Sequence, residues 1–212
     1  MIMNMKLYLA SSNRHKQIEM QQLLPNFKIC IPADDGISFN PAETGKSFAE
    51  NSLIKACALW DIIHEPVIAD DSGLCVTSLH DAPGIFTSRY AGADYMQGRP
   101  DGIKISQAEQ NRLLIEQVNA LNTTDRSCRY ICAMVLLLNK DRYFVAQEAF
   151  EGELVATIGD AAGNGGFGYD PIVYLPQYAK TVAEISTEEK NAISHRGKAV
   201  RAISSILQSL QL

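Results

Sequence analysis

The pattern of apolar and polar residues predicts several helices, each announced by a capping residue. The clearest stripe recurs at helical spacing through Ala49, Leu53, Ala56, Trp60 and Ile63. Ser and Asn side chains can accept hydrogen bonds from the first N–H groups of a helix, so they mark where helices begin. Helices are expected at residues 14–24, from 47 to about 63, from 106 to about 121, from 186, and at 196–210.

Short apolar runs bounded by turn residues predict strands in the same chain. They lie at residues 6–10, 27–31, 67–69, 74–79, 129–138, 142–153 and 171–175, and a loop with short turns is expected at 82–98. The polar residues 70–73 interrupt the run that begins at Val67. The two longest strands flank a tight turn at 139–141 and predict a hairpin. Because a hairpin sits among alternating helices and strands, we expect an α/β fold with a mixed sheet.

Composition places limits on the class of protein. With 212 residues and 46% hydrophobic residues, the chain is expected to form a single domain, 1–212, with one or two lobes. The formal net charge of −5 argues against nucleic acid or an anionic membrane as a partner. Apolar runs stay shorter than a membrane span, and the first residues become polar too soon for a signal peptide.

The five cysteines favour a reducing compartment. They are Cys30, Cys57, Cys75, Cys128 and Cys132, an odd number without a C-x-x-C pair. They lie within apolar runs, where free cysteine behaves as a small hydrophobe. We therefore expect a cytoplasmic protein without a zinc site.

A glycine-rich segment at 163–176, G-N-G-G-F-G-Y-D-P-I-V-Y-L-P, is the most unusual stretch of the chain. Glycine loses more backbone entropy on folding than any other residue, so such a loop usually lets a ligand approach the backbone. Backbone N–H groups there could hold a phosphate or the edge of a base. The alternative is an ordinary glycine-rich hairpin corner.

Two adjacent carboxylates, Asp70 and Asp71, follow the apolar run 67–69. Burial of carboxylates is costly unless they meet a metal ion or hydrogen-bond donors. Mg²⁺ commonly binds one or two carboxylates together with phosphate oxygens and water. The alternative is a simple turn with the sequence Asp-Asp-Ser-Gly.

Two further segments combine cations with helix starts. Residues 11–16, S-S-N-R-H-K, follow a strand, so N–H groups and Lys16 could bind phosphate; the alternative is a helix cap with a surface lysine. On the next helix Asn51 and Lys55 share a face, while Glu50 has the capping-box position and Lys55 could equally be a solvated lysine.

The segment 194–196, S-H-R, places two cationic side chains in a first helical turn, close to Lys190 in the preceding sequence. Cations there oppose the helix dipole unless a ligand or a carboxylate offsets them. The alternative to a ligand is a salt bridge to Glu188 or Glu189.

Taken together, these segments resemble the inosine triphosphate pyrophosphatase family. Six motifs follow one another in the family's order, at residues 11–16, 48–56, 69–74, 83–92, 163–171 and 189–199. Residues 97–106 are an extra segment relative to the family pattern. The resemblance implies an elongated mixed sheet flanked by helices, two lobes with a cleft between them, and a homodimer.

The resemblance also implies the reaction and the residues that perform it. Non-canonical purine nucleoside triphosphates (ITP, dITP and XTP) would be hydrolysed to the monophosphate and pyrophosphate with Mg²⁺. Asp71 would accept the proton and bind the metal ion, with Glu50 as the second carboxylate. The phosphate-binding residues would be Ser11, Ser12, Asn13, Lys16, Lys55 and Ser72. The residues near the base would be Phe167, which stacks on it, Gly168, Tyr169, Asp170, Lys190, His195 and Arg196.

Hydrogen-bond polarity explains how such a site could select its base. Hypoxanthine and xanthine present an acceptor at O6 and a donor at N1, whereas adenine presents the reverse. A site with donors to O6 leaves buried groups unpaired when adenine binds. Two alternatives are a septum-inhibitor-type pyrophosphatase acting on pyrimidine or modified nucleotides, and a non-catalytic nucleotide-binding protein. The 194–197 segment and the glycine-rich loop argue against the first, and the Asp70–Asp71 pair with Glu50 and Lys55 argues against the second.

Overall fold

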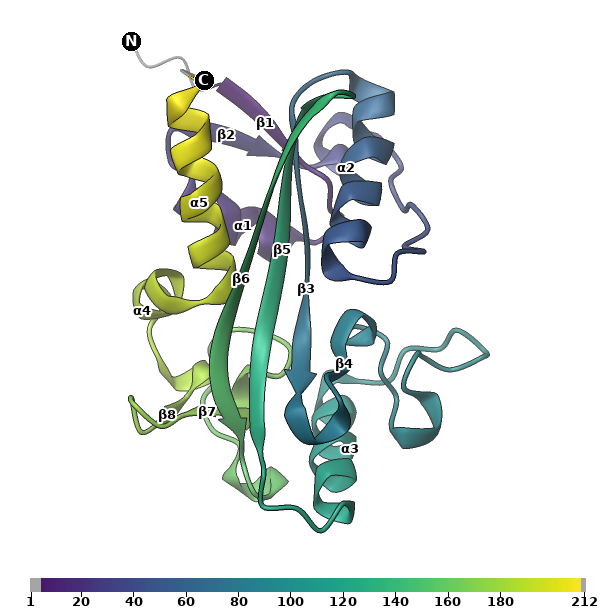
Figure 1. The fold of residues 1–212 in the computed structure, drawn as a ribbon, viewed down its shortest axis with the longest axis vertical. Coiled ribbons are helices and arrows are strands. Elements are labelled where there is room, and N and C mark those ends of the chain that lie inside the picture. Colours follow the sequence, from purple (N-terminus) through teal and green to yellow (C-terminus); the bar gives the residue numbers. More distant parts are fainter. Residues whose placement is uncertain (1–4, 211–212) are drawn as a thin grey trace. The chain divides into compact units, whose positions relative to one another are not determined.

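The computed structural model describes residues 5–210, which pack into two compact units. Unit 1 comprises the chain up to Asp71, Cys132–Glu148 and the chain from His195. Unit 2 comprises Ser72–Ile131 and Ala149–Ser194. Three strands, labelled β3, β5 and β6 in Figure 1, contribute residues to both units.

Within residues 5–210, eight strands join one mixed sheet in the order β2-β1-β3-β5-β6-β7-β8, with β4 paired to β3. They are β1 Met5–Leu9, β2 Phe27–Cys30, β3 Val67–Val76, β4 Ala82–Pro83, β5 Ser127–Asn139, β6 Arg142–Leu154, β7 Val173–Leu175 and β8 Lys180–Thr181. Strand β1 is parallel to β2 and β3, whereas β3–β4, β6–β7 and β7–β8 are antiparallel. The expected mixed sheet is confirmed.

The helices begin where the capping residues predict. They are α1 Arg14–Leu23, α2 Phe48–Ile63, α3 Gln107–Ala120, α4 Thr187–Ile193 and α5 His195–Ser209. The cap of α1 is Asn13, whose side chain accepts the N–H of His15 at 2.9 Å. Serine side chains cap α2, α3 and α4 in the same way, so local hydrogen bonding sets these boundaries.

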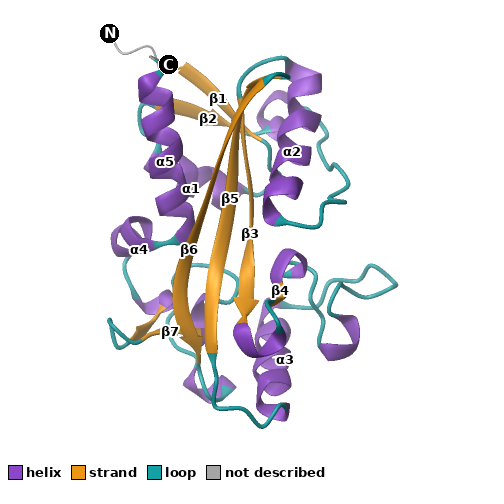
Figure 2. Cartoon of the chain, viewed as in Figure 1, coloured by secondary structure: helices purple, strands orange, loops and turns teal. Residues whose placement is uncertain are grey.

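The central strands of the sheet in unit 1 are buried on both faces, and successive residues of each strand alternate between the two. Leu7 and Leu9 of β1 pack with α1 and α5 on one face, whereas Tyr8 packs with α2 on the other. Figure 2 shows α1 and α5 on one side of this part of the sheet and α2 on the opposite side. Because both faces are covered, the central strands are nearly continuous apolar runs.

Unit 2 has a separate hydrophobic core. Leu114, Ile115 and Val118 of α3 pack there against the parts of β3, β5 and β6 that belong to this unit, and against β7. Tyr90 and Tyr169 are buried in the same core. The glycine-rich loop is therefore followed directly by residues that anchor it to a packed interior.

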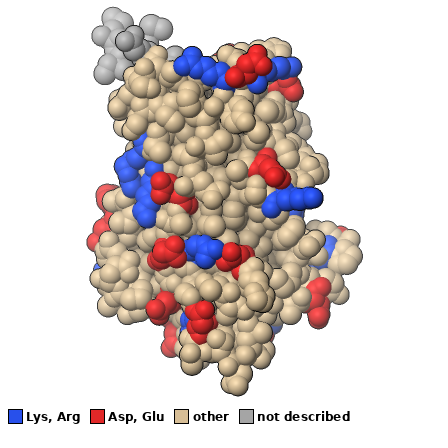
Figure 3. All heavy atoms as spheres, viewed as in Figure 1, with Lys and Arg blue, Asp and Glu red and all other residues tan. Residues whose placement is uncertain are grey.

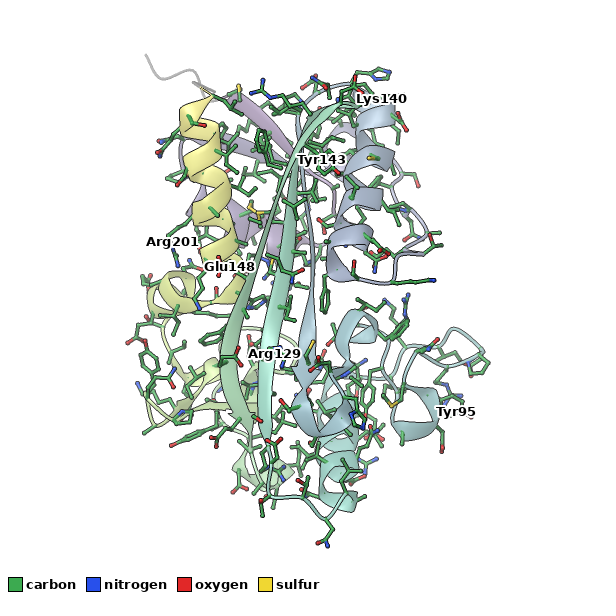
Figure 4. All side chains as sticks on the ribbon, viewed as in Figure 1. Tyr95, Arg129, Lys140, Tyr143, Glu148 and Arg201 are labelled. Atoms are coloured by element: carbon green, nitrogen blue, oxygen red, sulfur yellow. The ribbon has the colours of Figure 1, made fainter. Side chains whose placement is uncertain are left out.

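The structure corrects the sequence prediction at several places, including residues 77–79, which form a 3₁₀ turn rather than the end of a strand, and the short strand β4 within the predicted loop 82–98. Strand β3 runs without a break from Val67 to Val76, so the predicted interruption at 70–73 is wrong. Strand β7 begins at Val173 because Asp170–Ile172 form a 3₁₀ turn, and the short strand β8 was not predicted. The hairpin turn is confirmed, and Figure 4 shows Lys140 in that turn and Tyr143 on β6.

The surface and the cysteines fit the composition. On the face seen in Figure 3, acidic and basic side chains lie interspersed. All five cysteines are free, and all but Cys57 are buried, as expected for small apolar side chains. Among residues 5–210, no helix is long and apolar enough to cross a membrane.

The double burial of β5 predicts that neighbouring residues of this strand are both important for stability. Leu136 packs with α1 and α5, while Leu137 packs with α2. Leu136→Ala and Leu137→Ala should each lower the free energy of unfolding by about 2–5 kcal/mol, because each leaves a cavity. Urea denaturation would measure this, with Val145→Ala on the exposed side of β6 as the mild control. A negligible loss in either leucine variant would contradict the two-faced packing.

Candidate active site

The predicted site residues form separate clusters in the two units. Unit 1 contains the loop that precedes α1, the start of α2, the Asp70–Asp71 pair, and His195 and Arg196 at the start of α5. Unit 2 contains Ser72, the glycine-rich loop and Lys190.

The pleat of β3 sends Asp70 and Asp71 to opposite faces of the sheet of unit 1. Asp70 lies two residues after Ile68 in the strand and so shares its face, which packs with α1 and α5. Asp71 lies two residues after Ala69 and so shares its face, which packs with α2. Both side chains are buried, with exposures of 1% and 8%. Two adjacent carboxylates therefore lie in different surroundings and can serve different purposes.

Asp71 receives two donors from α2. The Lys55 ammonium lies 3.0 Å from its Oδ1 atom, and the Asn51 side-chain amide donates to its Oδ2 at 3.3 Å. Helix α2 is fixed above this part of β3 because the Ser52 hydroxyl donates to the carbonyl of Ala69 at 2.9 Å. Lys55 is only 7% exposed, so the reading of this residue as a solvated lysine is excluded.

A second carboxylate, Glu43, reaches the same ammonium, with its Oε1 3.3 Å from Lys55 Nζ. It lies on the loop before α2, and Gly45 lets this loop come close. The Gly45 N–H donates to Asn51 Oδ1 at 2.8 Å, and a Cβ on Gly45 would lie 2.7 Å from that oxygen. Glu43, Asn51, Lys55 and Asp71 are called the Asp71 cluster below.

Glu50, the predicted second carboxylate, has a different set of contacts. Its Oε2 accepts the N–H of Lys46 at 2.6 Å, and its own N–H donates to the Ser47 hydroxyl at 3.2 Å. The side chain is exposed and closes the turn that carries Glu43 toward Lys55. These contacts support the capping interpretation of Glu50. Its role as a metal ligand stays a prediction.

Burial and charge change the protonation equilibria of the Asp71 cluster. Burial raises the pKa of Asp71 above that of an ordinary carboxyl group, and the nearby Glu43 adds to this, although Lys55 opposes it. Burial alone would lower the pKa of Lys55, but Asp71, Asp70 and Glu43 outweigh it and raise that pKa. The cluster thus combines a firmly charged lysine with a carboxylate that is more basic than usual.

Asp70 is the centre of a buried ion network with Lys16, Glu19 and Arg196, called the Asp70 network below. Lys16 Nζ lies 3.0 Å from Asp70 Oδ1 and 2.9 Å from Oδ2. The guanidinium of Arg196 donates to Oδ2 through Nε at 3.2 Å and through Nη2 at 3.0 Å. Its Nη1 donates to Glu19 at 2.7 Å. Two cations and two anions therefore balance one another.

The Asp70 network explains why cations are tolerated at the start of α5. Arg196 is 1% exposed, and it forms salt bridges with Asp70 and Glu19. Burial alone would raise the pKa of Asp70, but Lys16 and Arg196 outweigh it and hold that pKa far below the usual range. Contact of Arg196 with a base stays a prediction, and its observed partners give it a structural role.

The loop before α1 has the features of a helix N-terminus that is open to solvent. Ser12 and Asn13 are exposed, and the Asn13 N–H donates to the Ser11 hydroxyl at 3.1 Å. Lys16 lies one turn into α1, where its ammonium contacts Asp70. The alternative interpretation of Lys16 as a surface lysine is therefore excluded, since its side chain is 15% exposed.

In unit 2 the carboxylate of Asp170 holds the glycine-rich loop. Its Oδ2 accepts the N–H of Phe167 at 2.8 Å and lies 2.6 Å from Lys190 Nζ. Its Oδ1 accepts the hydroxyl of Tyr130 at 3.0 Å. Phe167 is 40% exposed, and the Lys190 ammonium lies 5.0 Å from the centre of its ring. Tyr130, Phe167, Asp170 and Lys190 are called the Asp170 cluster below.

The residues around Asp170 are also fixed to the core of unit 2. Tyr169 is 4% exposed, and its hydroxyl donates to the carbonyl of Thr87 at 3.0 Å. The Gly168 carbonyl accepts the side-chain amide of Asn111 at 3.3 Å. Both Tyr169 and Asp170 anchor the loop from inside, so their direct contact with a base stays a prediction.

Sequence reasoning missed Glu43, Glu19 and Tyr130. Glu43 lies on an irregular loop without a periodic signal, and Glu19 is one of several polar residues on α1. Tyr130 alternates with apolar residues of β5 and is typical of a core position. Only a clue to which segments lie together in space could have found these residues.

The Asp71 cluster fits a divalent cation that also binds phosphate oxygens. Glu43 and Asp71 are held on one lysine, and Mg²⁺ commonly takes one or two carboxylates and completes its shell with phosphate and water. Among residues 5–210, no group of three or more His, Cys, Asp or Glu side chains could hold a metal ion. These residues alone would therefore not fill the coordination shell of a metal ion.

Comparison with known proteins identifies the family. The sequence model of the Ham1 family matches residues 7–206. The chain belongs to the Ham1 family. The dITP/XTP pyrophosphatase of Treponema denticola is 46% identical over 205 residues, which cover 96% of this chain and 99% of that protein. The dITP/XTP pyrophosphatase of Coxiella burnetii is 37% identical over 206 residues, with 96% of each chain covered.

Solved structures of Ham1 proteins have the same fold. The HAM1 protein of Coxiella burnetii superposes with a TM-score of 0.84 at 36% identity, and covers 97% of this chain and 99% of that one. The Ham1 protein of Staphylococcus aureus gives a TM-score of 0.81 at 32% identity, with coverages of 96% and 98%. The predicted family and fold class are therefore confirmed.

The Asp70 network predicts how stability depends on pH. Because the pKa of Asp70 is depressed in the folded state, its contribution is present above the unfolded pKa, about 3.9, and is lost as the pH falls further. Asp70→Asn should cost roughly 3–5 kcal/mol at neutral pH, since it leaves buried cations uncompensated. It should also flatten the loss of stability below about pH 4.

Urea denaturation at several pH values would test this prediction. Asp61→Asn, which alters an exposed ion pair with Lys140, is the matched control and should change little. Equal stability of Asp70→Asn and the wild type at neutral pH would show that the network contributes nothing.

Proposed function

We propose that this protein hydrolyses non-canonical purine nucleoside triphosphates, namely ITP, dITP and XTP, to the monophosphate and pyrophosphate. The observation that carries the proposal is the Asp71 cluster, in which a buried carboxylate of raised pKa is held by Lys55 beside Glu43. A binding protein has little need for such a group. The names of the Treponema and Coxiella relatives support the same activity.

Asp71 is proposed to accept the proton from the attacking water. A bound metal ion would lower the pKa of the attacking water, so that a carboxylate held beside it can accept the proton. Lys55 and Asn51 fix both oxygens of the carboxylate, so the base has a defined orientation. Water would attack the α-phosphorus, and pyrophosphate would leave.

The phosphates are proposed to bind at the start of α1 and at the lysines. The exposed residues Ser12 and Asn13 precede α1, where the helix dipole favours anions. Lys16 would supply positive charge from the first turn of α1, and Lys55 from α2. Ser11 and Ser72 complete the predicted set. Most of the catalytic effect would come from positioning and from neutralising charge.

Mg²⁺ is the proposed cofactor, with Asp71 and Glu43 as its protein ligands. When bound, such an ion neutralises phosphate charge and makes water easier to deprotonate. The common contact of both carboxylates with Lys55 supports this pair, and the contacts of Glu50 support a positioning role for it.

The base is proposed to be recognised by residues of the glycine-rich loop and by nearby cations. The exposed ring of Phe167 is suited to stack on a purine. Lys190 can donate to an acceptor at O6, which hypoxanthine and xanthine have and adenine lacks. Gly168, Tyr169, Asp170, His195 and Arg196 remain predicted members of this region.

The expected homodimer, the cytoplasmic location and the absence of nucleic-acid or membrane partners rest on the sequence and the family resemblance alone, and they stay predictions.

Release of pyrophosphate in the presence of Mg²⁺ would test the proposed reaction. ITP, XTP and dITP should turn over about tenfold faster or more than ATP, GTP, TTP and UTP. The polarity of the base edge accounts for the difference from ATP, whereas guanine, which shares that edge, would have to be rejected at its 2-amino group. Asp71→Asn should lower kcat by about 10²–10⁴ while substrate binding persists. Asp61→Asn is the control carboxylate. Equal turnover of all nucleotides would refute the base selection, and no turnover would favour a binding protein.

The choice of the second metal ligand has a separate test. Glu43→Gln should raise the Mg²⁺ concentration for half-maximal activity about tenfold or more, since it removes a carboxylate from the Asp71 cluster. Glu50→Gln keeps an acceptor for the Lys46 N–H, so it should change the Mg²⁺ concentration for half-maximal activity little. Calorimetric titration with Mg²⁺ would measure binding independently of turnover. A large effect of Glu50→Gln with none of Glu43→Gln would restore Glu50 as the ligand.

A further inference from the structure

The buried carboxylate of Asp170 joins three elements of unit 2. It receives Tyr130 from β5, the backbone of Phe167 from the glycine-rich loop and Lys190 from α4. Asp170 itself is 3% exposed, so its charge depends on these donors for compensation. Lys190 supplies the positive charge, and the two other donors are neutral.

The donors are divided unequally between the two oxygens. Oδ2 takes the N–H of Phe167 and the ammonium of Lys190, while Oδ1 takes the hydroxyl of Tyr130. Rotation of an aspartate carboxylate about its last bond is soft and nearly two-fold, so packing alone specifies its orientation weakly. The hydrogen bond from Tyr130 constrains Oδ1, while the Phe167 N–H and the Lys190 ammonium constrain Oδ2.

The glycine-rich loop lies directly against this carboxylate. A Cβ atom on Gly166 would lie 2.0 Å from Asp170 Oδ2, so only glycine fits there. The loop backbone is therefore close to the carboxylate, and the N–H of the next residue, Phe167, donates to the same Oδ2 atom at 2.8 Å. The exposed ring of Phe167 and the ammonium of Lys190, which lies 5.0 Å from the ring centre, both depend on the same Oδ2 atom.

We propose that Tyr130 is a positioning residue for base recognition: its hydroxyl orients Asp170, and Asp170 in turn orients the ring of Phe167 and the ammonium of Lys190. This inference rests on the proposed function, because it names a residue that orients the loop proposed to bind the base. The hydroxyl stays protonated and able to donate, since burial and the Asp170 carboxylate raise the pKa of Tyr130 well above its usual value. Tyr130 acts from beneath the loop, through Asp170.

Tyr130→Phe would test the proposal, because phenylalanine keeps the ring in the core and removes the hydroxyl. We expect KM for ITP to rise about tenfold, the usual cost of one hydrogen bond to a charged group, and kcat to change less than about twofold. Inhibition by the product IMP should weaken by a similar factor. Inhibition by inorganic pyrophosphate, which has no base, should stay unchanged.

Tyr90→Phe is the matched control. Tyr90 is also fully buried in the core of unit 2, and its hydroxyl donates to Gln117 on α3 at 2.6 Å, away from Asp170. Removal of this hydroxyl costs a buried hydrogen bond without touching the Asp170 cluster. It should lower the melting temperature comparably and leave the ratio of IMP to pyrophosphate inhibition as in the wild type.

The outcomes separate this inference from the proposed function. A wild type without activity on ITP and XTP refutes the function itself. An active wild type, combined with a Tyr130→Phe variant whose IMP and pyrophosphate inhibition are both unchanged or both weakened alike, refutes the role of Tyr130 and leaves the function standing. The role of Tyr130 is supported if inhibition by IMP, but not by pyrophosphate, is weakened in Tyr130→Phe and unchanged in Tyr90→Phe.

Discussion

The buried charge of Asp70 is the constraint on which unit 1 depends. A carboxylate taken out of water at the centre of a sheet is tolerated only when cations reach it, and here Lys16 and Arg196 come from two different helices. Glu19 balances the second cation, so the group is neutral as a whole. Helices α1 and α5 are thus held to β3 by ion pairs as well as by apolar packing.

The pleat of β3 then allows the next residue to do something different. Asp71 faces α2, where Lys55 is the cation and Glu43 is a second anion. Lys16 and Arg196 keep the pKa of Asp70 far below its usual range, whereas burial raises the pKa of Asp71. The two adjacent aspartates differ in pKa because successive side chains of a strand point to opposite faces of the sheet and so meet different neighbours.

Local signals were sufficient to predict the helices and the hairpin, whereas the grouping of Asp71 with Lys55 followed from the resemblance to a family. Caps and apolar stripes act within a few residues, so the sequence carries them directly. The course of β3 could not be predicted in the same way, because Asp-Asp-Ser-Gly has low strand propensity and is stabilised by distant cations. Glu43, Glu19 and Tyr130 acquire their meaning only from contacts between segments far apart in the chain.

The separation of those contacts along the chain has a consequence for synthesis. Arg196 is 126 residues from Asp70 and 177 from Glu19, and α5 is part of the same unit as α1. While the ribosome is still making α5, one face of the sheet in unit 1 is covered by α1 alone and Asp70 lacks its guanidinium. Unit 1 is therefore the last part of the chain to become complete, although it contains the first residues to emerge.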